Sequence, residues 1–232
     1  MTRIVAWGGL TDARDLGGLP VDDERTKFWS FYRSARLDDL AEEGWQQLVD
    51  AGVRTVVDLR NLDEVEPVVF PADSVTYVHP MDDRTDDEFM RLWSRLMNSP
   101  VYYADSLNRF PENVARVFAV FAEAPEGGVL FHCGGGQDRT GLIAAMLLRL
   151  VGVADVVIAD DYEISARAMN DVYRADPSPL EPAKTDEELE SWIAETRENL
   201  LRFLADLDVE IFLVTNGVTE EQIDRIKVRL LR

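Results

Sequence analysis

The sequence is poor in the residues that build disulfides and metal sites. It contains a single cysteine, Cys133, and two histidines, His79 and His132, among 232 residues. One cysteine excludes an internal disulfide and fits a reducing compartment. Without a second cysteine or a histidine cluster, the usual ligand sets of zinc sites are excluded as well. We therefore expect no metal and no other cofactor, and Cys133 is left for a structural or a chemical role.

Positive charge and long apolar runs are also scarce. The chain carries 24 Lys+Arg against 44 Asp+Glu, a net charge of −20. A field of this sign repels nucleic acid and anionic membranes, so we expect no nucleic-acid partner. No stretch approaches the roughly 20 apolar residues of a membrane span. The first nine residues are too short and broken for a signal peptide. We expect no membrane insertion and a cytoplasmic location.

Short apolar runs alternate with helical patterns along the chain. Strands are predicted at 28–32, 53–59, 75–79 and 129–132, and the second and fourth are apolar enough for the middle of a parallel sheet. Helices are predicted between and after these strands, at 38–50, 87–97, 112–124, 142–151 and 154–173. This alternation predicts an α/β fold with a central, mainly parallel sheet of four to five strands flanked by helices.

The last part of the chain reads as a helical flank. Prolines and small residues at 176–184 predict a connecting loop, and helices are predicted at 185–204, at 209–216 and from 219 onward. We expect one domain over 1–232. In sheets of this kind, ligands bind beyond the carboxyl ends of the strands, which is where Cys133 lies.

Cys133 begins a glycine-rich turn between a predicted strand and a predicted helix. Gly134, Gly135 and Gly136 follow it, and Arg139 comes six positions after the cysteine. Three glycines allow successive amides to curve into the loop, and the start of the helix adds the positive end of its dipole. The planar fork of Arg139 can bind two phosphate oxygens. The turn therefore predicts a cradle for an oxyanion.

The same donors favour the reactive thiolate of Cys133 over the thiol. Thr140 is placed to donate a hydrogen bond to the thiolate, and Gln137 lies in the loop. The predicted reaction is attack on a phosphate monoester through a cysteinyl-phosphate intermediate, with the phosphoryl group held in line with the sulfur. The alternative of a Walker loop would need Gly-Lys-Ser/Thr at its end. A buried structural cysteine in a plain turn is the other alternative.

A proton donor for the leaving group is predicted among the aspartates. Asp82 and Asp83 lie just past the predicted strand 75–79, at the edge of the sheet that carries Cys133. They could equally belong to a solvated acidic run at 82–88. Asp138, inside the loop, is a competing acid, a base that orients water, or a structural carboxylate.

Several segments now show a family likeness. His132-Cys133-x5-Arg139-Thr140-Gly141 resembles the signature of the cysteine-dependent protein tyrosine phosphatases, and more closely that of a bacterial tyrosine and dual-specificity subgroup with a secreted mycobacterial member. The segments 12–18, 32–37, 56–60 and 217–219 resemble further motifs of that subgroup. The resemblance implies a phosphatase-like fold and phosphotyrosine or mixed phosphoprotein substrates. It also implies a helical lid, for which the helix 87–97 with Arg84, Arg91 and Arg95 is the candidate; a solvated amphipathic helix is the alternative.

Two positions depart from the subgroup's loop. Gly135 replaces its alanine and Gln137 replaces its lysine, which removes a cation from the rim of the pocket. The loss of this cation weakens the case for a phosphoinositide substrate. Phosphorylated proteins and small phosphate esters stay as candidate substrates. Arg14, Asp15, Asp58 and Arg60 are expected to brace the loop, and His132 to hydrogen-bond at its base. A module that binds phosphotyrosine without turnover, and a phosphatase of small-molecule or lipid phosphates, stay open as alternatives. An arsenate-reducing enzyme is a further alternative, but it would ordinarily need a resolving cysteine, and this sequence has only one cysteine.

Overall fold

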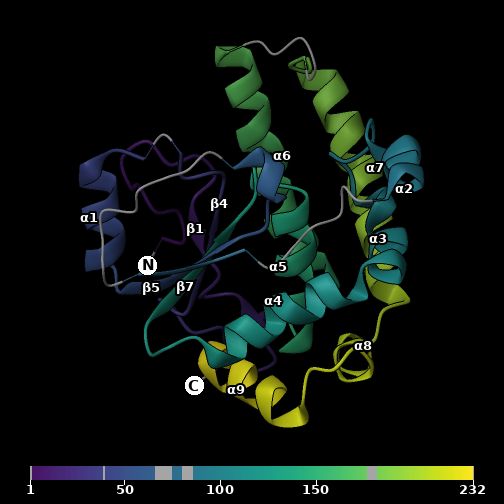
Figure 1. Cartoon of the computed structure of the whole chain (residues 1–232). Coiled ribbons are helices and arrows are strands. Elements are labelled where there is room, and N and C mark those ends of the chain that lie inside the picture. Colours follow the sequence, from purple (N-terminus) through teal and green to yellow (C-terminus); the bar gives the residue numbers. More distant parts are fainter. Residues whose placement is uncertain (1, 39, 66–74, 80–85, 177–181, 232) are drawn as a thin grey trace.

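A computed structural model describes residues 2–38, 40–65, 75–79, 86–176 and 182–231. Within this part of the chain, the main sheet has five strands in the order β1-β4-β7-β5-β6 (Figure 1). They are β1 (Arg14–Asp15), β4 (Phe31–Ser34), β7 (Gly128–His132), β5 (Val53–Asp58) and β6 (Thr76–Val78). β1 pairs antiparallel with β4, and the other pairs are parallel. The mainly parallel sheet of four to five strands is confirmed.

Helices occupy most of the remaining described chain. Their bounds are α1 (Glu42–Asp50), α2 (Asp87–Trp93), α3 (Tyr103–Arg109), α4 (Pro111–Glu123), α5 (Arg139–Leu150), α6 (Asp155–Ala175), α7 (Asp186–Ala205), α8 (Val209–Thr215) and α9 (Glu220–Leu231). Two short 3-10 helices, η1 (Leu62–Glu64) and η2 (Pro100–Tyr102), and a hairpin of β2 (Pro20–Val21) and β3 (Glu24–Arg25) complete the described elements. The helical C-terminal flank is confirmed.

Four local predictions are corrected. The strand expected at 28–32 lies at Phe31–Ser34, because Trp29 has a left-handed backbone with φ 66° that interrupts the extended chain. The helix expected at 87–97 ends at Trp93. Residues 103–109, for which no element was predicted, form α3. The helix expected from 142 begins at Arg139, three residues earlier, so Arg139 and Thr140 lie in its first turn.

Alternate side chains of the central strands face two separate cores. Val56 and Leu130 point to a core with Trp45 of α1, whereas Val57 and Phe131 point to the larger core under α4 and α5. This alternation is what a strand's two-residue period imposes. Each face is thereby covered by helices, and the strand β7 lies at the middle of the sheet (Figure 1). The polar residues Ser34, Asp58 and His132 lie at the carboxyl ends of their strands, beyond the two apolar cores.

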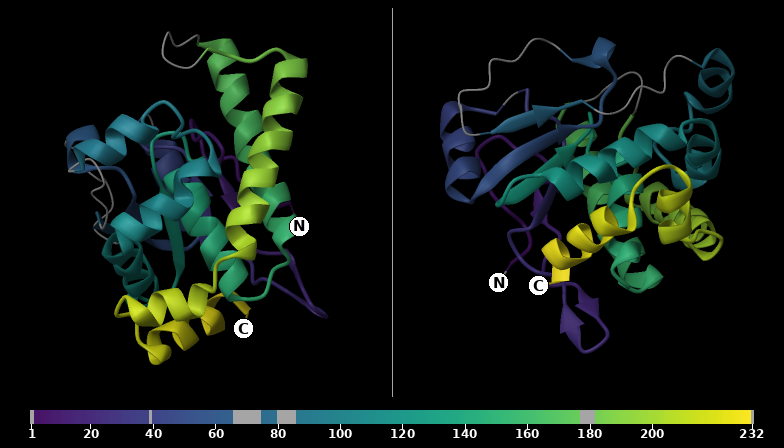
Figure 2. Two further views of the ribbon diagram at one scale, coloured as in Figure 1. Left: turned by 90° about the vertical axis from the view of Figure 1, so that its right-hand side faces the viewer. Right: turned by 60° about the horizontal axis from the view of Figure 1, so that its bottom comes forward.

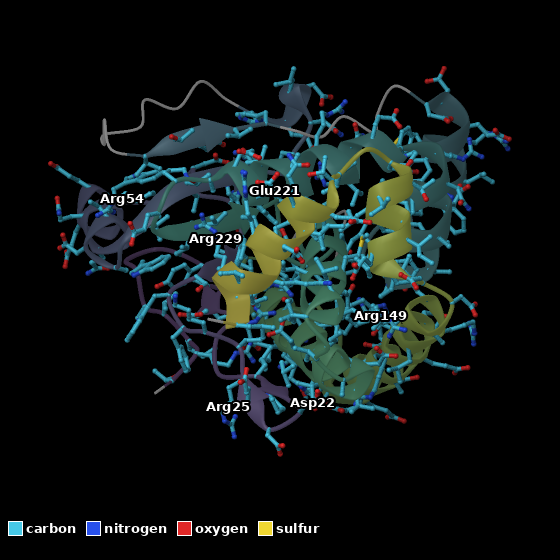
Figure 3. All side chains as sticks on the ribbon, turned by 90° about the horizontal axis from the view of Figure 1, so that it is seen from below. Asp22, Arg25, Arg54, Arg149, Glu221 and Arg229 are labelled. Atoms are coloured by element: carbon cyan, nitrogen blue, oxygen red, sulfur yellow. The ribbon has the colours of Figure 1, made fainter. Side chains whose placement is uncertain are left out.

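The C-terminal helices enclose the molecule on one side and below. α6 and α7 lie side by side and extend beyond the sheet (Figure 2). α9 crosses the underside, where the Arg229 guanidinium donates to the Gly127 carbonyl oxygen at 2.7 Å (Figure 3). The backbone N–H of Lys27 donates to the Leu230 carbonyl oxygen at 2.7 Å. The last helix therefore fastens the turns that lead into β4 and β7.

Candidate active site

The glycine-rich turn lies at the carboxyl edge of the sheet. β7 ends at His132, Cys133 follows it with 3% of its surface exposed, and α5 begins at Arg139. The register places Ser34 of β4 on one side of His132 and Asp58 of β5 on the other. Because these three strands are parallel, their carboxyl ends meet around the turn. The predicted strand–loop–helix arrangement is present.

Three carbonyl groups of the loop are bound by the surrounding scaffold. The Arg36 N–H donates to Gly134 O at 2.9 Å, the Arg33 guanidinium to Gly136 O at 2.7 Å, and the Tyr103 hydroxyl to Asp138 O at 2.8 Å. In a planar trans peptide, the C=O and the following N–H point in opposite directions. The N–H groups of the residues after these carbonyls, at positions 135, 137 and 139, therefore point away from the scaffold, as an anion cradle requires.

Gly136 is the position in the loop that requires glycine. Its φ is 73°, in the left-handed region, and a Cβ there would lie 2.6 Å from the Ser34 carbonyl oxygen. By contrast, a Cβ at Gly134 would meet nothing within 4 Å. The glycine run is therefore needed at its third position for a steric and a conformational reason.

A buried group of charges lies beneath the loop on the β4 side. We call this group the Asp161 cluster; its members are Arg3, Asp12, Arg14, Arg33, Asp161 and Ser165. The Asp161 carboxylate accepts from Arg14 Nε at 3.0 Å and from Arg33 Nη1 at 2.8 Å. It also pairs with Arg3. Since Arg33 also binds Gly136 O, the cluster is joined directly to the loop.

Burial and neighbouring charge act against each other in this cluster. Burial alone would raise the pKa of Asp161, but the charges of Arg14 and Arg33 lower it well below its ordinary value. Burial, together with the charge of Arg14, lowers the pKa of Arg33. Burial raises the pKa of Asp12, which pairs with Arg14. Asp161 is therefore the ionised centre that makes the burial of the arginines tolerable.

A second charged group lies on the β5 side. We call it the Asp58 cluster; its members are Asp38, Asp58, Arg60, Tyr77 and His132. Arg60 bridges Asp58 and Asp38, with Nη2 to Asp58 Oδ2 at 2.7 Å and Nη1 to Asp38 Oδ2 at 2.6 Å. The Tyr77 hydroxyl donates to Asp58. Burial would raise the pKa of Asp58, but these hydrogen bonds and nearby His132 lower it to about 2.

His132 links the Asp58 cluster to the base of the loop. Its Nδ1 lies 3.2 Å from the Cys133 carbonyl oxygen, which can only accept, so Nδ1 is the donor. Its Nε2 lies 3.8 Å from Asp58 Oδ2. Burial lowers the pKa of His132 below its ordinary value, although Asp58 acts in the opposite direction. The expected hydrogen bond at the loop base is confirmed.

Arg139 is held by a carboxylate that sequence reasoning missed. Its Nη1 donates to Glu64 Oε2 at 2.6 Å and its Nη2 to Glu64 Oε1 at 2.9 Å. Glu64 is the last residue of η1, which follows β5. Nothing in the spacing of Glu64 from the cysteine loop points to this pair. The available signal was its place just beyond the carboxyl end of a predicted central strand.

The other loop residues take up different environments. Asp138 is half-buried and is the N-cap residue of α5. The Thr140 hydroxyl is buried and makes no hydrogen bond to any described residue, so the expected donation to Cys133 is not formed here. Gln137 is 5% exposed, and its amide nitrogen donates to Asn98 O at 3.1 Å. Gln137 therefore ties the loop to the chain after α2 rather than standing at an exposed rim.

The residues expected to brace the loop or to form a lid lie in different surroundings. Arg14 belongs to the Asp161 cluster, whereas Asp15 accepts the N–H groups of Gly17 and Trp29 and shapes the N-terminal segment. Arg91 on α2 is 71% exposed. α2 is fastened to α3 by Trp93 Nε1, which donates to Asp105 at 2.7 Å. Asp82, Asp83 and Arg84 lie outside the described residues, and the lid stays a prediction.

Neither a metal cluster nor a spanning helix occurs in the described part of the chain. No group of three His, Cys, Asp or Glu side chains within residues 2–38, 40–65, 75–79, 86–176 and 182–231 is arranged to hold a metal ion. Over the same residues, no helix combines the length and the apolarity that crossing a membrane demands. The charged side chains gathered around the loop bind one another instead.

The fold and the loop together define an α/β protein whose central strand leads into a glycine-rich loop, with a cysteine at its start and an arginine at its end. The model of the tyrosine phosphatase family matches residues 5–232, and the chain belongs to that family. A tyrosine-protein phosphatase of Nostoc commune is 31% identical over 224 residues, covering 87% of this chain and 74% of the relative.

Other relatives match over shorter stretches. The triple specificity protein phosphatase PtpB of Mycobacterium tuberculosis is 29% identical over 163 residues, which cover 56% of this chain and 58% of the relative. Among solved structures, TpbA of P. aeruginosa in complex with pTyr is 16% identical, with a TM-score of 0.39 and coverage of 82% of this chain and 87% of that chain. Human DUSP28 is 18% identical, with a TM-score of 0.32 and coverage of 73% and 89%.

Proposed function

We propose that this protein hydrolyses phosphate monoesters through a cysteinyl-phosphate intermediate, with phosphotyrosine or mixed phosphoprotein substrates. The observation that carries the proposal is the loop from Cys133 to Arg139. The nucleophile lies at its base, three loop carbonyls are bound by the scaffold, and the arginine stands in the first turn of α5. Membership of the tyrosine phosphatase family supports the same reaction class.

The first step is an in-line displacement at phosphorus. The Cys133 sulfur forms the S–P bond as the bond from phosphorus to the ester oxygen breaks, and the departing oxygen takes a proton from Asp82 or Asp83. The loop amides and Arg139 bind the equatorial oxygens, whose charge must be stabilised in the transition state. A thiolate needs no added base, because it carries the electron pair that forms the new bond.

The second step returns the enzyme. Water attacks the phosphorus, the S–P bond breaks, and the sulfur leaves as thiolate while inorganic phosphate is released. A carboxylate must accept the proton of the attacking water. Asp138 is the candidate within the loop, and the aspartate that acted as acid in the first step is the other candidate. The N-cap position of Asp138 keeps its side chain at the start of α5, next to Arg139.

The substrate class follows from the charge available at the loop. Gln137 is neutral and is held by Asn98 O, so this side chain brings no second cation to the loop. A monoester with one phosphate fits such a cradle better than a highly phosphorylated lipid or inositol. The names of the Nostoc and mycobacterial relatives, both protein phosphatases, support phosphoprotein substrates. A cytoplasmic site of action is part of the proposal.

A substrate panel with a matched blank tests the proposal. Phosphotyrosine and phosphoserine peptides, an aryl phosphate, an alkyl phosphate and phosphoinositides are offered to the wild type and to Cys133→Ser. We expect turnover of the aryl esters by the wild type and none by the variant. Equal turnover by both would exclude the cysteine mechanism. Binding of phosphopeptide by the wild type without turnover of any ester would establish a binding module instead.

The acid is assigned by leaving-group dependence. Asp82→Asn and Asp83→Asn are each compared on an alkyl phosphate and on an aryl phosphate with a good leaving group. Loss of the acid should slow the alkyl ester more than the aryl ester, by about 100-fold, because only the poor leaving group needs protonation. Equal losses on both esters would show that the substituted residue does not protonate the leaving group.

A further inference from the structure

The last peptide of the cysteine loop is held by a tyrosine from outside the sheet. The first two bound loop carbonyls are held from β4 and the chain just after it. Asp138 O instead accepts from the hydroxyl of Tyr103, the first residue of α3, at 2.8 Å. Asp138 O also accepts the Leu142 N–H of α5 at 2.8 Å, so both of its lone pairs are used. The peptide between Asp138 and Arg139 is therefore fixed from two directions.

The Tyr103 side chain is locked as a hydrogen-bond donor. It is fully buried, and its ring stands edge-on to the rings of Tyr102 and Phe203, with centroids 5.1 and 5.4 Å apart. Burial raises the pKa of Tyr103 well above its ordinary value, so the hydroxyl keeps its proton at neutral pH. A carbonyl oxygen can only accept, and the hydroxyl is therefore the donor to Asp138 O.

Gly141 leaves the space that the Tyr103 hydroxyl occupies. A Cβ at position 141 would lie 2.8 Å from the Tyr103 hydroxyl oxygen and 2.8 Å from Cε2 of Tyr162. Glycine is a poor helix former, yet it stands here in the first turn of α5. The close approach of the tyrosine explains why a side chain is missing at this point. The glycine at the end of the loop signature and the hydroxyl of Tyr103 are thus two parts of one contact.

The chain before α3 makes a second contact with the same half of the loop. The Gln137 amide nitrogen donates to Asn98 O at 3.1 Å, just before η2. The segment from Asn98 to Tyr103 therefore binds two successive residues of the loop. Loss of the Tyr103 hydroxyl alone would leave the Gln137 contact in place, so the loop would stay seated while its last peptide loses one of its two constraints.

We propose that Tyr103 is a positioning residue that turns the backbone N–H of Arg139 toward the phosphoryl group. The inference rests on the proposed function and gives a role to a residue outside the loop signature. The C=O and the following N–H of a trans peptide point in opposite directions, so the group that holds Asp138 O also sets the direction of the Arg139 N–H. A donor that is oriented in advance needs no reorganisation when charge develops on the equatorial oxygens.

Removal of the hydroxyl with retention of the ring tests this role in turnover. On an aryl phosphate, we expect Tyr103→Phe to lower kcat/KM about 30-fold, mostly through kcat, because the donor acts more strongly on the transition state than on bound substrate. The matched control is Tyr32→Phe. Tyr32 is 1% exposed, and its hydroxyl donates to Ala51 O at 3.5 Å in the other core. No change in kcat/KM is expected for this control. Equal losses in the two variants, or no loss in Tyr103→Phe, would overturn the proposal.

Phosphate binding followed by NMR tests the orientation without turnover. Inorganic phosphate is titrated into isotope-labelled Cys133→Ser, and the backbone amide protons of Gly135, Gln137 and Arg139 should move downfield as they bind it. Adding Tyr103→Phe should reduce the shift of Arg139 by about half or more, because hydrogen bonds weaken steeply when misaligned. The shifts of Gly135 and Gln137 should persist, since other groups hold the carbonyls before them.

The pattern of amide shifts separates a positioning role from a structural one. Equal reduction at all the amides, or no reduction at Arg139, would overturn the role of Tyr103. A wild type that binds phosphate but hydrolyses no ester would overturn the proposed function, and the amide shifts would still decide the role of Tyr103. Absence of any phosphate-induced shift would overturn both.

Discussion

The two charged clusters that flank the loop differ in sign and in how they reach it. The Asp161 cluster holds three arginines and two aspartates, and Arg33 bonds directly to Gly136 O. The Asp58 cluster holds two aspartates and one arginine, and it reaches the loop through His132 and the Cys133 carbonyl oxygen. The loop therefore lies between a cationic scaffold on the β4 side and an anionic one on the β5 side.

The two clusters hold different parts of the loop. The cationic side fixes the middle of the loop through Arg33, and its excess of positive charge favours the anion that the proposed function requires there. The anionic side fixes the strand end that carries the cysteine. It also holds Arg60, which leaves Arg139 as the loop's own cation, with Glu64 as its partner. Loss of the cationic side should therefore cost more than loss of the anionic side.

The largest effect is expected from Asp161→Asn. The change leaves buried arginines beside a neutral group, and removal of one partner of a buried ion pair costs about 4 kcal/mol of unfolding free energy. Denaturant unfolding measures the loss. The control is Asp160→Asn on the same helix, where a 65% exposed carboxylate pairs with Arg197 and less than about 1 kcal/mol is expected. Similar losses for the two variants would show that the buried Asp161 cluster contributes no more to stability than an exposed ion pair.

A somewhat smaller effect is expected from Gly136→Ala, at the point where the cationic side meets the loop. The left-handed backbone and the 2.6 Å approach to Ser34 O should together cost about 3 kcal/mol. Gly134→Ala is the control, since open space surrounds its Cβ position and its unfolding free energy should match the wild type. If the two alanine variants unfold at the same denaturant concentration, the tight turn at Gly136 is not required.

The smallest of the three effects is expected from Asp58→Asn on the anionic side. The pKa of Asp58 lies at about 2, below its ordinary value of 3.8. The ionised form is thus favoured by folding, and its contribution is present above pH 4 and is lost as the pH falls toward 2. The shift corresponds to about 2 kcal/mol at neutral pH.

Unfolding free energies measured between pH 7 and pH 2 test the direction of this pH dependence. The difference between the wild type and Asp58→Asn should be full at pH 7 and should shrink between pH 4 and pH 2. Asp50→Asn, at an exposed position on α1, serves as the control for loss of a surface carboxylate, and its unfolding free energy at pH 7 should lie within about 0.5 kcal/mol of the wild type. A difference that grows on acidification would contradict the assignment of Asp58 as the ionised partner of Arg60.

Much of the fold was predictable because its signals are local. Strands at 53–59 and 129–132 were recognised by buried apolar runs, and β5 and β7 match them within a residue. The strand expected at 28–32 was misplaced because the left-handed Trp29 is held by an N–H bond to Asp15, a residue far back in the sequence. α3 was missed because its buried face depends on packing with α4 and η2, which no local period reveals.

The sequence by itself determined the loop: a cysteine, three glycines, an arginine six positions on, and the strand and helix on either side. These are neighbours along the chain, so their spacing alone brings them together. Only the tertiary structure decided what holds them. Asp161, Arg33 and Glu64 come from segments 28 to 100 residues from Cys133, and they meet the loop because parallel strands end at one edge of the sheet and α6 packs beneath it. Contacts of that kind are set by packing, which leaves no periodic mark in the sequence.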